Sequence, residues 1–100
     1  VPDMASDLAL MMLKVDLGLK SPPEDVENFL VLKLSAAEAE LKELYDIAID
    51  CEKVEDMQLQ EMYAAWLYRK RVEGEAKPPM LRQAIRDRQL AAARIGKAGS

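Results

Sequence analysis

Carboxylates and arginines are the side chains of this sequence that could do chemistry, because the usual catalytic groups are missing. The chain has no histidine and a single cysteine, Cys51. This composition excludes a zinc site of ordinary ligand type, an acid–base or nucleophilic triad, and a disulfide framework within one chain. We expect Cys51 to be a small, partly buried side chain rather than a reactive thiol. The sequence therefore predicts no catalytic residue, no metal site and no cofactor.

A group of carboxylates lies in the first half of the chain, at Glu38, Glu40, Glu43 and Asp46. A magnesium or calcium site needs carboxylate oxygens that converge from a loop or from several helices. These four residues fall within or next to one predicted helix, and they point around its outside. We therefore interpret them as a solvated acidic face, which could also receive arginines from a neighbouring molecule.

Basic side chains gather in the second half of the chain. Residues 1–62 hold fifteen acids and five bases, whereas residues 63–100 hold three acids and nine bases, within a net charge of −4. Arginine at this density can bind phosphate, carboxylate or an acidic protein surface, although solvation and helix-dipole compensation explain the same pattern. If the halves occupy different faces, identical copies can form a heterologous contact that closes into a ring. The predicted partner-binding cations are Arg82, Arg86, Arg88, Arg94 and Lys97.

Helices must position these charges, since the apolar spacing is helical and no strand is convincing. We predict an all-α fold, a single domain over residues 1–100 built as a compact bundle. Gly18 should end the first helix, and Ser21-Pro22 with Glu24 match a capping box with proline in the first helical position. The basic C-terminal helix and tail cover residues 79–100. The helices are expected at about 4–17, 22–45, 54–72 and 79–95, with an extended link near 46–52.

The third predicted helix carries the strongest packing signal. It is apolar on every side between its acidic start and its cationic end, which is typical of a helix buried by its neighbours. On the first helix, Leu8, Met11, Met12 and Val15 share one face. Val31 and Leu32 lie off the main apolar stripe of the second helix and are predicted to contact something outside the core. The predicted core comprises Leu30, Leu34, Leu41, Met62, Trp66, Leu81 and Ile85.

Four segments occur in an order that resembles the small head–tail connector proteins of tailed bacteriophages. They are LKVDLG at 13–18, IAID at 47–50, MYAAWLYRKR at 62–71 and PMLRQAIRDR at 79–88, with a long capped helix between the first two. The likeness covers roughly residues 10–90. It lies in the order and separation of these segments, because no single one of them is diagnostic.

The resemblance implies a structural subunit of the virion that has no enzymatic activity. Such subunits assemble as a dodecameric ring under the portal, extend the DNA channel and dock a stopper or tail-completion protein. The implied partners are other copies of the chain, the portal protein, that stopper or tail component, and genomic DNA that passes without sequence-specific binding. The free subunit is either monomeric or already assembled. Its implied location is the head–tail interface, after synthesis in the bacterial host cytoplasm, and no membrane partner is expected.

Residues 54–95 also allow a second interpretation, a small helical DNA-binding regulator. The third and fourth helices would then form a helix-turn-helix pair with the basic helix in the major groove. The connection from Gly74 to Pro79 is longer than the usual turn of about three or four residues. The acidic first half of the chain would also repel DNA. Sequence-selective binding of duplex DNA would distinguish this interpretation from the first.

Overall fold

The computed structural model describes the backbone of residues 4–70 and 74–98, and the side chains of residues 8–70 and 74–93. Within these ranges the chain forms four helices and no strand. This confirms the predicted all-α fold. The predicted extended link near 46–52 is a non-helical connection over residues 46–53, in which Asp46 is left-handed and Cys51 and Glu52 lie in a turn. The helices are α1 (Met4–Leu17), α2 (Glu24–Tyr45), α3 (Val54–Arg69) and α4 (Pro79–Ala98).

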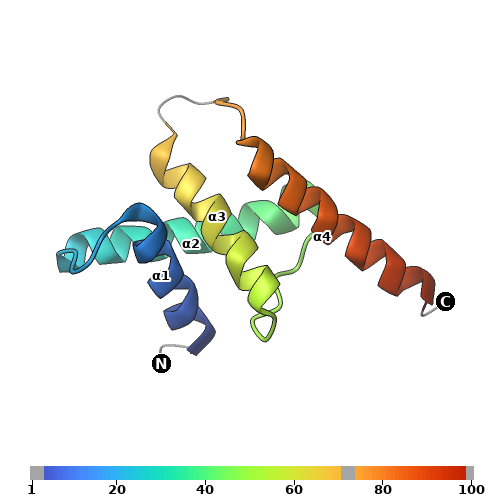
Figure 1. The fold of residues 1–100 in the computed structure, drawn as a ribbon, viewed down its shortest axis with the longest axis horizontal. Coiled ribbons are helices and arrows are strands. Elements are labelled where there is room, and N and C mark those ends of the chain that lie inside the picture. Colours follow the sequence, from blue (N-terminus) through green and yellow to red (C-terminus); the bar gives the residue numbers. More distant parts are fainter. Residues whose placement is uncertain (1–3, 71–73, 99–100) are drawn as a thin grey trace.

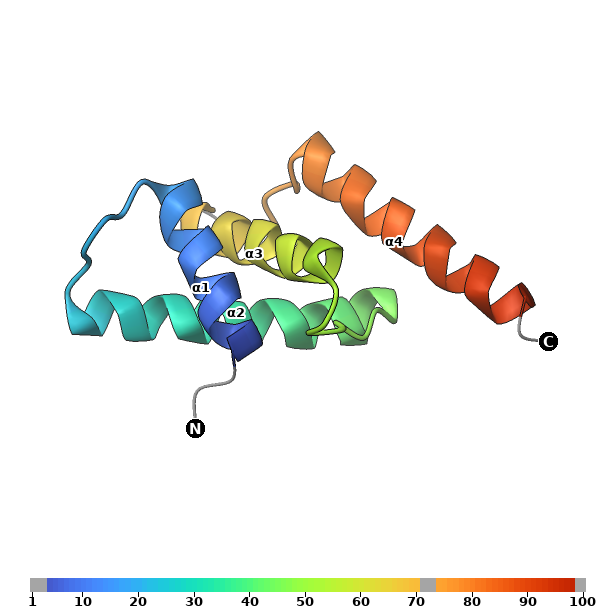
Figure 2. The ribbon, with the colours of Figure 1, turned by 60° about the horizontal axis from the view of Figure 1, so that its bottom comes forward.

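Helix α3 lies at the centre of the arrangement. It contacts α1, α2 and α4. Helix α2 forms one layer, and α1 and α3 cross the same face of it (Figures 1 and 2). Helix α4 packs on α3 with its first half, and its second half extends away from the other helices in both views. The side chains of residues 89–93 are accordingly exposed.

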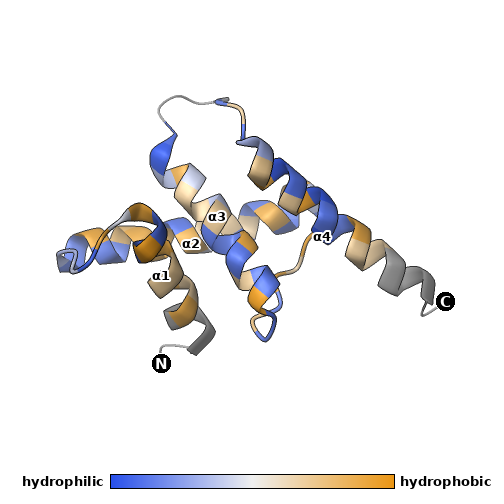
Figure 3. Cartoon of the chain, viewed as in Figure 1, coloured by the Kyte–Doolittle hydropathy of each residue, from blue (hydrophilic) through white to orange (hydrophobic). Residues whose placement is uncertain are grey.

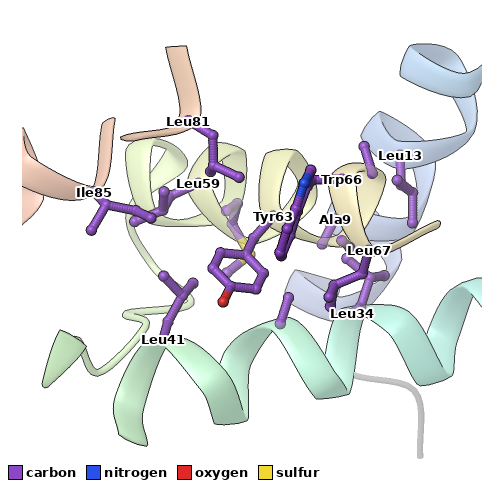
Figure 4. Packing of buried hydrophobic residues seen from close by; sticks show 14 of the residues in the cluster. Ala9, Leu13, Leu34, Leu41, Leu59, Tyr63, Trp66, Leu67, Leu81 and Ile85 are labelled. Atoms are coloured by element: carbon purple, nitrogen blue, oxygen red, sulfur yellow. The ribbon is translucent and has the colours of Figure 1, made fainter. Parts of the chain in front are cut away.

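The core confirms most of the predicted packing. Leu30, Leu34, Leu41, Trp66, Leu81 and Ile85 are buried, whereas Met62 is only partly buried at the edge of the core. Figure 4 shows Leu34, Leu41, Trp66, Leu81 and Ile85 among the packed side chains of this core. Tyr63 is fully buried and makes edge-on contacts with Trp66 and Tyr45. Because three helices surround α3, its apolar character on every side is explained.

The buried face of α1 differs from the predicted one. Ala9 and Leu13 are buried, whereas Leu8, Met11 and Val15 are exposed and Met12 is partly buried. The helix is apolar on almost every side, as its colouring in Figure 3 also indicates. Periodicity alone therefore does not select the buried face, which is decided by packing against α3 and α2.

The end of α1 follows its glycine, as predicted. Gly18 has a φ of 74°, its N–H donates to the carbonyl oxygen of Val15 over 3.1 Å, and the N–H of Leu19 donates to that of Lys14 over 2.8 Å. This pair of hydrogen bonds is a Schellman motif, in which glycine supplies the left-handed residue.

The start of α2 lies two residues later than predicted, at Glu24, and no side chain caps it. The predicted capping box with Pro22 in the first helical position is therefore wrong. Pro22 precedes Pro23, and a residue before proline is driven away from the helical region by the proline ring. Pro23 itself stays extended, with a ψ of 157°.

The other helix ends shift by a few residues. Helix α3 ends at Arg69, because Lys70 already has an extended backbone with a ψ of 140°. Arg71 and Val72, which were predicted to extend this helix, lie outside the described residues. Helix α4 continues to Ala98, past the predicted end at residue 95.

Candidate functional site

A basic groove runs beside α4, where Arg82 and Arg86 are exposed one helical turn apart. The end of α2 and the segment before α4 form its other walls, and the groove has a volume of about 410 Å³. Figure 3 shows hydrophilic residues along this part of α4. The basic groove is defined by the side chains of Tyr45, Lys77, Arg82, Arg86 and Gln89.

Contacts among its own residues hold the groove in place. The side-chain amide of Gln89 donates a hydrogen bond to the carbonyl oxygen of Tyr45 over 3.0 Å, which joins α4 to the end of α2. The ammonium of Lys77 lies 4.6 Å from the ring of Trp66, 5.4 Å from that of Tyr45 and 5.5 Å from that of Tyr63. A cation over aromatic faces is attracted by the ring quadrupole. Lys77 therefore attaches the α3–α4 connection to the aromatic core.

The electrostatics of the basic groove favour an anionic partner. Among the described residues, no carboxylate lies within ion-pair distance of Arg82 or Arg86. Two like charges one turn apart on a helix repel each other by a few tenths of a kcal/mol, roughly. A carboxylate or phosphate placed between the two guanidinium groups would remove this repulsion and form charge-assisted hydrogen bonds.

Arg88 does not belong to this surface, contrary to the sequence-based prediction. Its Nε donates to Oδ1 of Asp56 over 2.8 Å, and its Nη2 donates to Oδ2 of Asp56 over 3.3 Å and to the carbonyl oxygen of Ala48 over 3.2 Å. Asp56 is buried, with 1% of its surface exposed, and also accepts the backbone N–H of Asp50 over 2.8 Å. Arg88 thus joins α4 to α3 and to the link before it. The helical register could have shown this, since Arg88 follows Leu81 and Ile85 on the buried side of α4.

The remaining predicted cations, Arg94 and Lys97, have side chains that lie outside the described residues. Their predicted role in partner binding therefore stays a prediction.

The four residues of the predicted acidic face have different environments in the structure. Glu38 and Glu43 are exposed on α2, but Glu40 is half-buried and accepts a hydrogen bond from the hydroxyl of Tyr63 over 3.0 Å. Burial and this carboxylate raise the pKa of the Tyr63 phenol. Asp46 is exposed but caps the end of α2, in a left-handed conformation with a φ of 57°. Of the four, Glu38 and Glu43 remain as exposed carboxylates within α2, five positions apart.

Apolar residues also lie on the surface of α2. Val31 is 43% exposed and Leu32 is 65% exposed, in agreement with their predicted position outside the core. Phe29 and Leu44, which the periodicity assigns to the buried stripe, are exposed as well. These side chains give α2 an outer surface that is partly apolar, and such surfaces are common at protein interfaces.

Two groove residues were not anticipated from the sequence. Lys77 and Gln89 gain their roles through contacts with Tyr45, Tyr63 and Trp66, which are distant in the chain, so no local pattern indicates them. Cys51 was expected to be partly buried but is exposed, because it lies in the link between α2 and α3.

Comparisons with protein-family models, with curated proteins and with solved structures found no match for this chain. Within the described residues, no group of three or more cysteine, aspartate or glutamate side chains is placed to hold a metal ion. None of the helices described combines the length and the apolar character that crossing a bilayer would require. For a functional interpretation, the described residues offer the charged and apolar surfaces set out above.

Proposed function

We propose that this chain is a structural head–tail connector subunit of a tailed bacteriophage. In this proposal the subunits form a dodecameric ring under the portal, extend the DNA channel and dock a stopper or tail-completion protein. The order of the four sequence segments suggests this class of protein. The observation that carries the proposal is the basic groove, whose two outward arginines have no carboxylate partner among the described residues.

A neighbouring copy of the chain offers the complementary charge. Glu38 and Glu43 are exposed on α2, a different helix from the one that carries Arg82 and Arg86. A contact between two different surfaces of identical subunits is heterologous, and it closes into a ring when the rotation between subunits permits. Opposite charges on these surfaces would set the register of the contact and speed its formation.

Exposed apolar side chains add to this argument. Val15 is 77% exposed, Met80 is 76% exposed and Leu32 is 65% exposed. A chain of 100 residues buries a limited core, so docking onto other subunits would stabilise it further. Fully buried interface centres are richer in apolar residues than the remaining surface. These three side chains are therefore candidates for contacts with a neighbour, the portal or the next tail component.

The charge balance suits a channel that does not hold DNA tightly. The whole chain carries a net charge of −4, whereas a protein that neutralises many phosphates binds DNA strongly and with marked salt dependence. The alternative of a helix-turn-helix regulator receives less support. The connection between α3 and α4 spans residues 70–78, longer than the usual turn of about three or four residues.

Charge reversal tests the proposed ring contact. The R82E/R86E variant and the E38K/E43K variant should each fail to assemble on the purified portal, because like charges would then face each other. A chain that carries all four changes should regain assembly, since the charges are again opposite. Sedimentation velocity in the presence of the portal measures the assembled fraction.

A matched control changes the charge elsewhere by the same amount. The K20E/K53E variant alters two exposed lysines outside the proposed contact, so it should assemble normally. Failure of the unmodified chain to associate with the portal at any concentration would refute the proposed function. Normal assembly of all variants would refute the proposed contact while leaving the function standing.

A further inference from the structure

The last part of α4 is a helix that extends away from its own subunit (Figures 1 and 2). We call residues 90–98 the α4 end. Leu90 is 49% exposed, and Ala92 and Ala93 are exposed as well. Most helical stability in proteins comes from packing of an apolar side against other elements. The α4 end would therefore gain stability from a surface that covers Leu90.

The α4 end is also basic. Its sequence carries Arg94 and Lys97 and no acid, which gives it a charge of +2. Surfaces that meet in a specific contact carry opposite charges, because complementary potentials set the register and like charges oppose the contact. A surface that receives the α4 end should therefore combine an apolar site for Leu90 with carboxylates beside it.

A groove of this kind lies between α3 and the middle of α4. It has a volume of about 340 Å³, and the apolar part of its lining consists of Leu59, Met62, Ala84 and Ala91. We call it the α3–α4 groove. A helix with its side chains is about 10–12 Å across, so a groove of this size would receive single side chains of a docked helix.

Carboxylates from both helices line the α3–α4 groove. Glu55 of α3 and Asp87 of α4 are exposed, and neither forms an ion pair with another described residue. The third carboxylate in the lining, Asp56, is paired with Arg88. Three carboxylates and one guanidinium give this lining a charge of −2, opposite to the +2 of the α4 end.

The α4 end cannot fill the groove of its own subunit. Helix α4 forms one wall of the groove as far as Ala91, and it is continuous from Pro79 to Ala98. Leu90 is thus held beside this groove and does not line it. A second copy of the chain has no such restriction, and it carries the matching apolar side chain and charge.

We propose that the α4 end of one copy docks on the α3–α4 groove of the next, with Leu90 inserted beside Leu59 and Met62. Because the two surfaces differ, the contact is heterologous and can repeat around a ring. This inference deepens the proposed function and rests on the self-association which that function requires. It does not involve the α2 surface that carries Glu38 and Glu43, so the two contacts can be tested separately.

Photochemical cross-linking in the full-length chain tests the contact. The photoreactive amino acid p-benzoylphenylalanine replaces Leu90, and this chain is mixed with ¹⁵N-labelled chain, with and without purified portal. The isotope identifies products that join two copies. We expect links from position 90 to residues 58–62 of the labelled copy. The same amino acid at position 32, on the outer surface of α2, is the control and should link to other segments.

Substitutions of Leu90 test the contact independently of the cross-link. Leu90→Gln should weaken self-association about tenfold or more in sedimentation velocity, the contribution expected from burying one leucine. Leu90→Met should retain self-association. Leu32→Gln is a matched control, because Leu32 is 65% exposed but lies on α2, away from the groove. Leu90 is half-exposed in the single subunit, so melting temperatures should confirm that all three variants fold.

Charge reversal tests the carboxylates of the groove. The E55K/D87K variant and the R94E/K97E variant should each weaken self-association, and the chain with all four changes should regain it, because the charges are again opposite.

The outcomes separate this contact from the proposed function. Links from position 90 that fall outside the groove, no link between copies in either mixture, or equal effects of Leu90→Gln and Leu32→Gln would each overturn the contact. If the chain still assembles on the portal in those cases, the proposed function stands. Groove links between free copies, without any assembly on the portal, would support the contact and count against the proposed function.

Discussion

The ion pair between Asp56 and Arg88 should contribute measurably to stability, because it joins the first half of α4 to the rest of the fold. Replacing Arg88 by methionine keeps much of the apolar stem and removes the guanidinium. Asp56, which is 1% exposed, then retains only the backbone N–H of Asp50 among the hydrogen bonds found here. The buried carboxylate loses the cation that compensates its desolvation.

The expected loss in the free energy of unfolding of R88M depends on how deeply Asp56 and Arg88 are buried. Removing one partner of a fully buried pair costs about 3–5 kcal/mol. The Arg88 side chain is 21% exposed, so water already reaches one side of the pair. We therefore expect a loss of about 2–3 kcal/mol, out of a total of about 5–10 kcal/mol for a domain of this size. The corresponding fall in melting temperature is about 10–20 °C.

Urea unfolding followed by Trp66 fluorescence measures the effect. With a slope of about 1–2 kcal/mol per molar urea, the midpoint of R88M should fall by about 1–3 M. R86M, which changes an exposed arginine on the same helix, should stay within about 0.5 kcal/mol of the unmodified chain. The double variant D56N/R88M should regain part of the loss, because no buried charge remains. Equal midpoints for R88M and R86M would refute the structural role of Arg88.

Three further substitutions test other parts of the fold. Burial raises the pKa of Glu61 to about 8 in the fold from an ordinary 4.5, so the unfolded chain releases this proton first and stability is lost as pH rises between those values. The melting temperature of E61Q relative to the unmodified chain should thus increase from about pH 5 to about pH 8.5. K77M should lose about 1–2 kcal/mol of stability in urea, in contrast to K20M, because the ammonium leaves the aromatic rings. L32S should unfold within about 0.5 kcal/mol of the unmodified chain but sediment with the portal less completely, and equal sedimentation would remove Leu32 from the interface.

Local signals were sufficient to predict the presence of the four helices, although not where α2 begins. Gly18 ends α1 through a left-handed residue, and Pro78 and Pro79 mark the start of α4, because proline is tolerated in the first turn of a helix but not in its interior. The spacing of Leu30, Leu34 and Leu41 likewise selects the buried side of α2. These features depend on residues that are neighbours in the chain, which is why sequence reasoning reached them.

Local sequence patterns could not predict contacts between residues that are distant in the chain. Arg88 donates to Asp56, which is 32 positions away in the sequence, and Tyr63 donates to Glu40, which is 23 positions away. In both contacts a charged side chain that the sequence suggests is solvated, Arg88 or Glu40, instead holds two helices together. The buried face of α1 was also mispredicted, since a helix that is apolar on most sides is oriented by its partners. The basic groove was predicted only in part, because Lys77 is positioned by three aromatic rings.

Native mass spectrometry of purified portal mixed with the protein tests whether this chain forms the proposed ring on the portal of a tailed phage. We expect a complex whose mass exceeds that of the portal alone by twelve subunits of 11.2 kDa each. A portal mass that stays unchanged, while the chain remains monomeric or dimeric at high concentration, would refute the proposed ring.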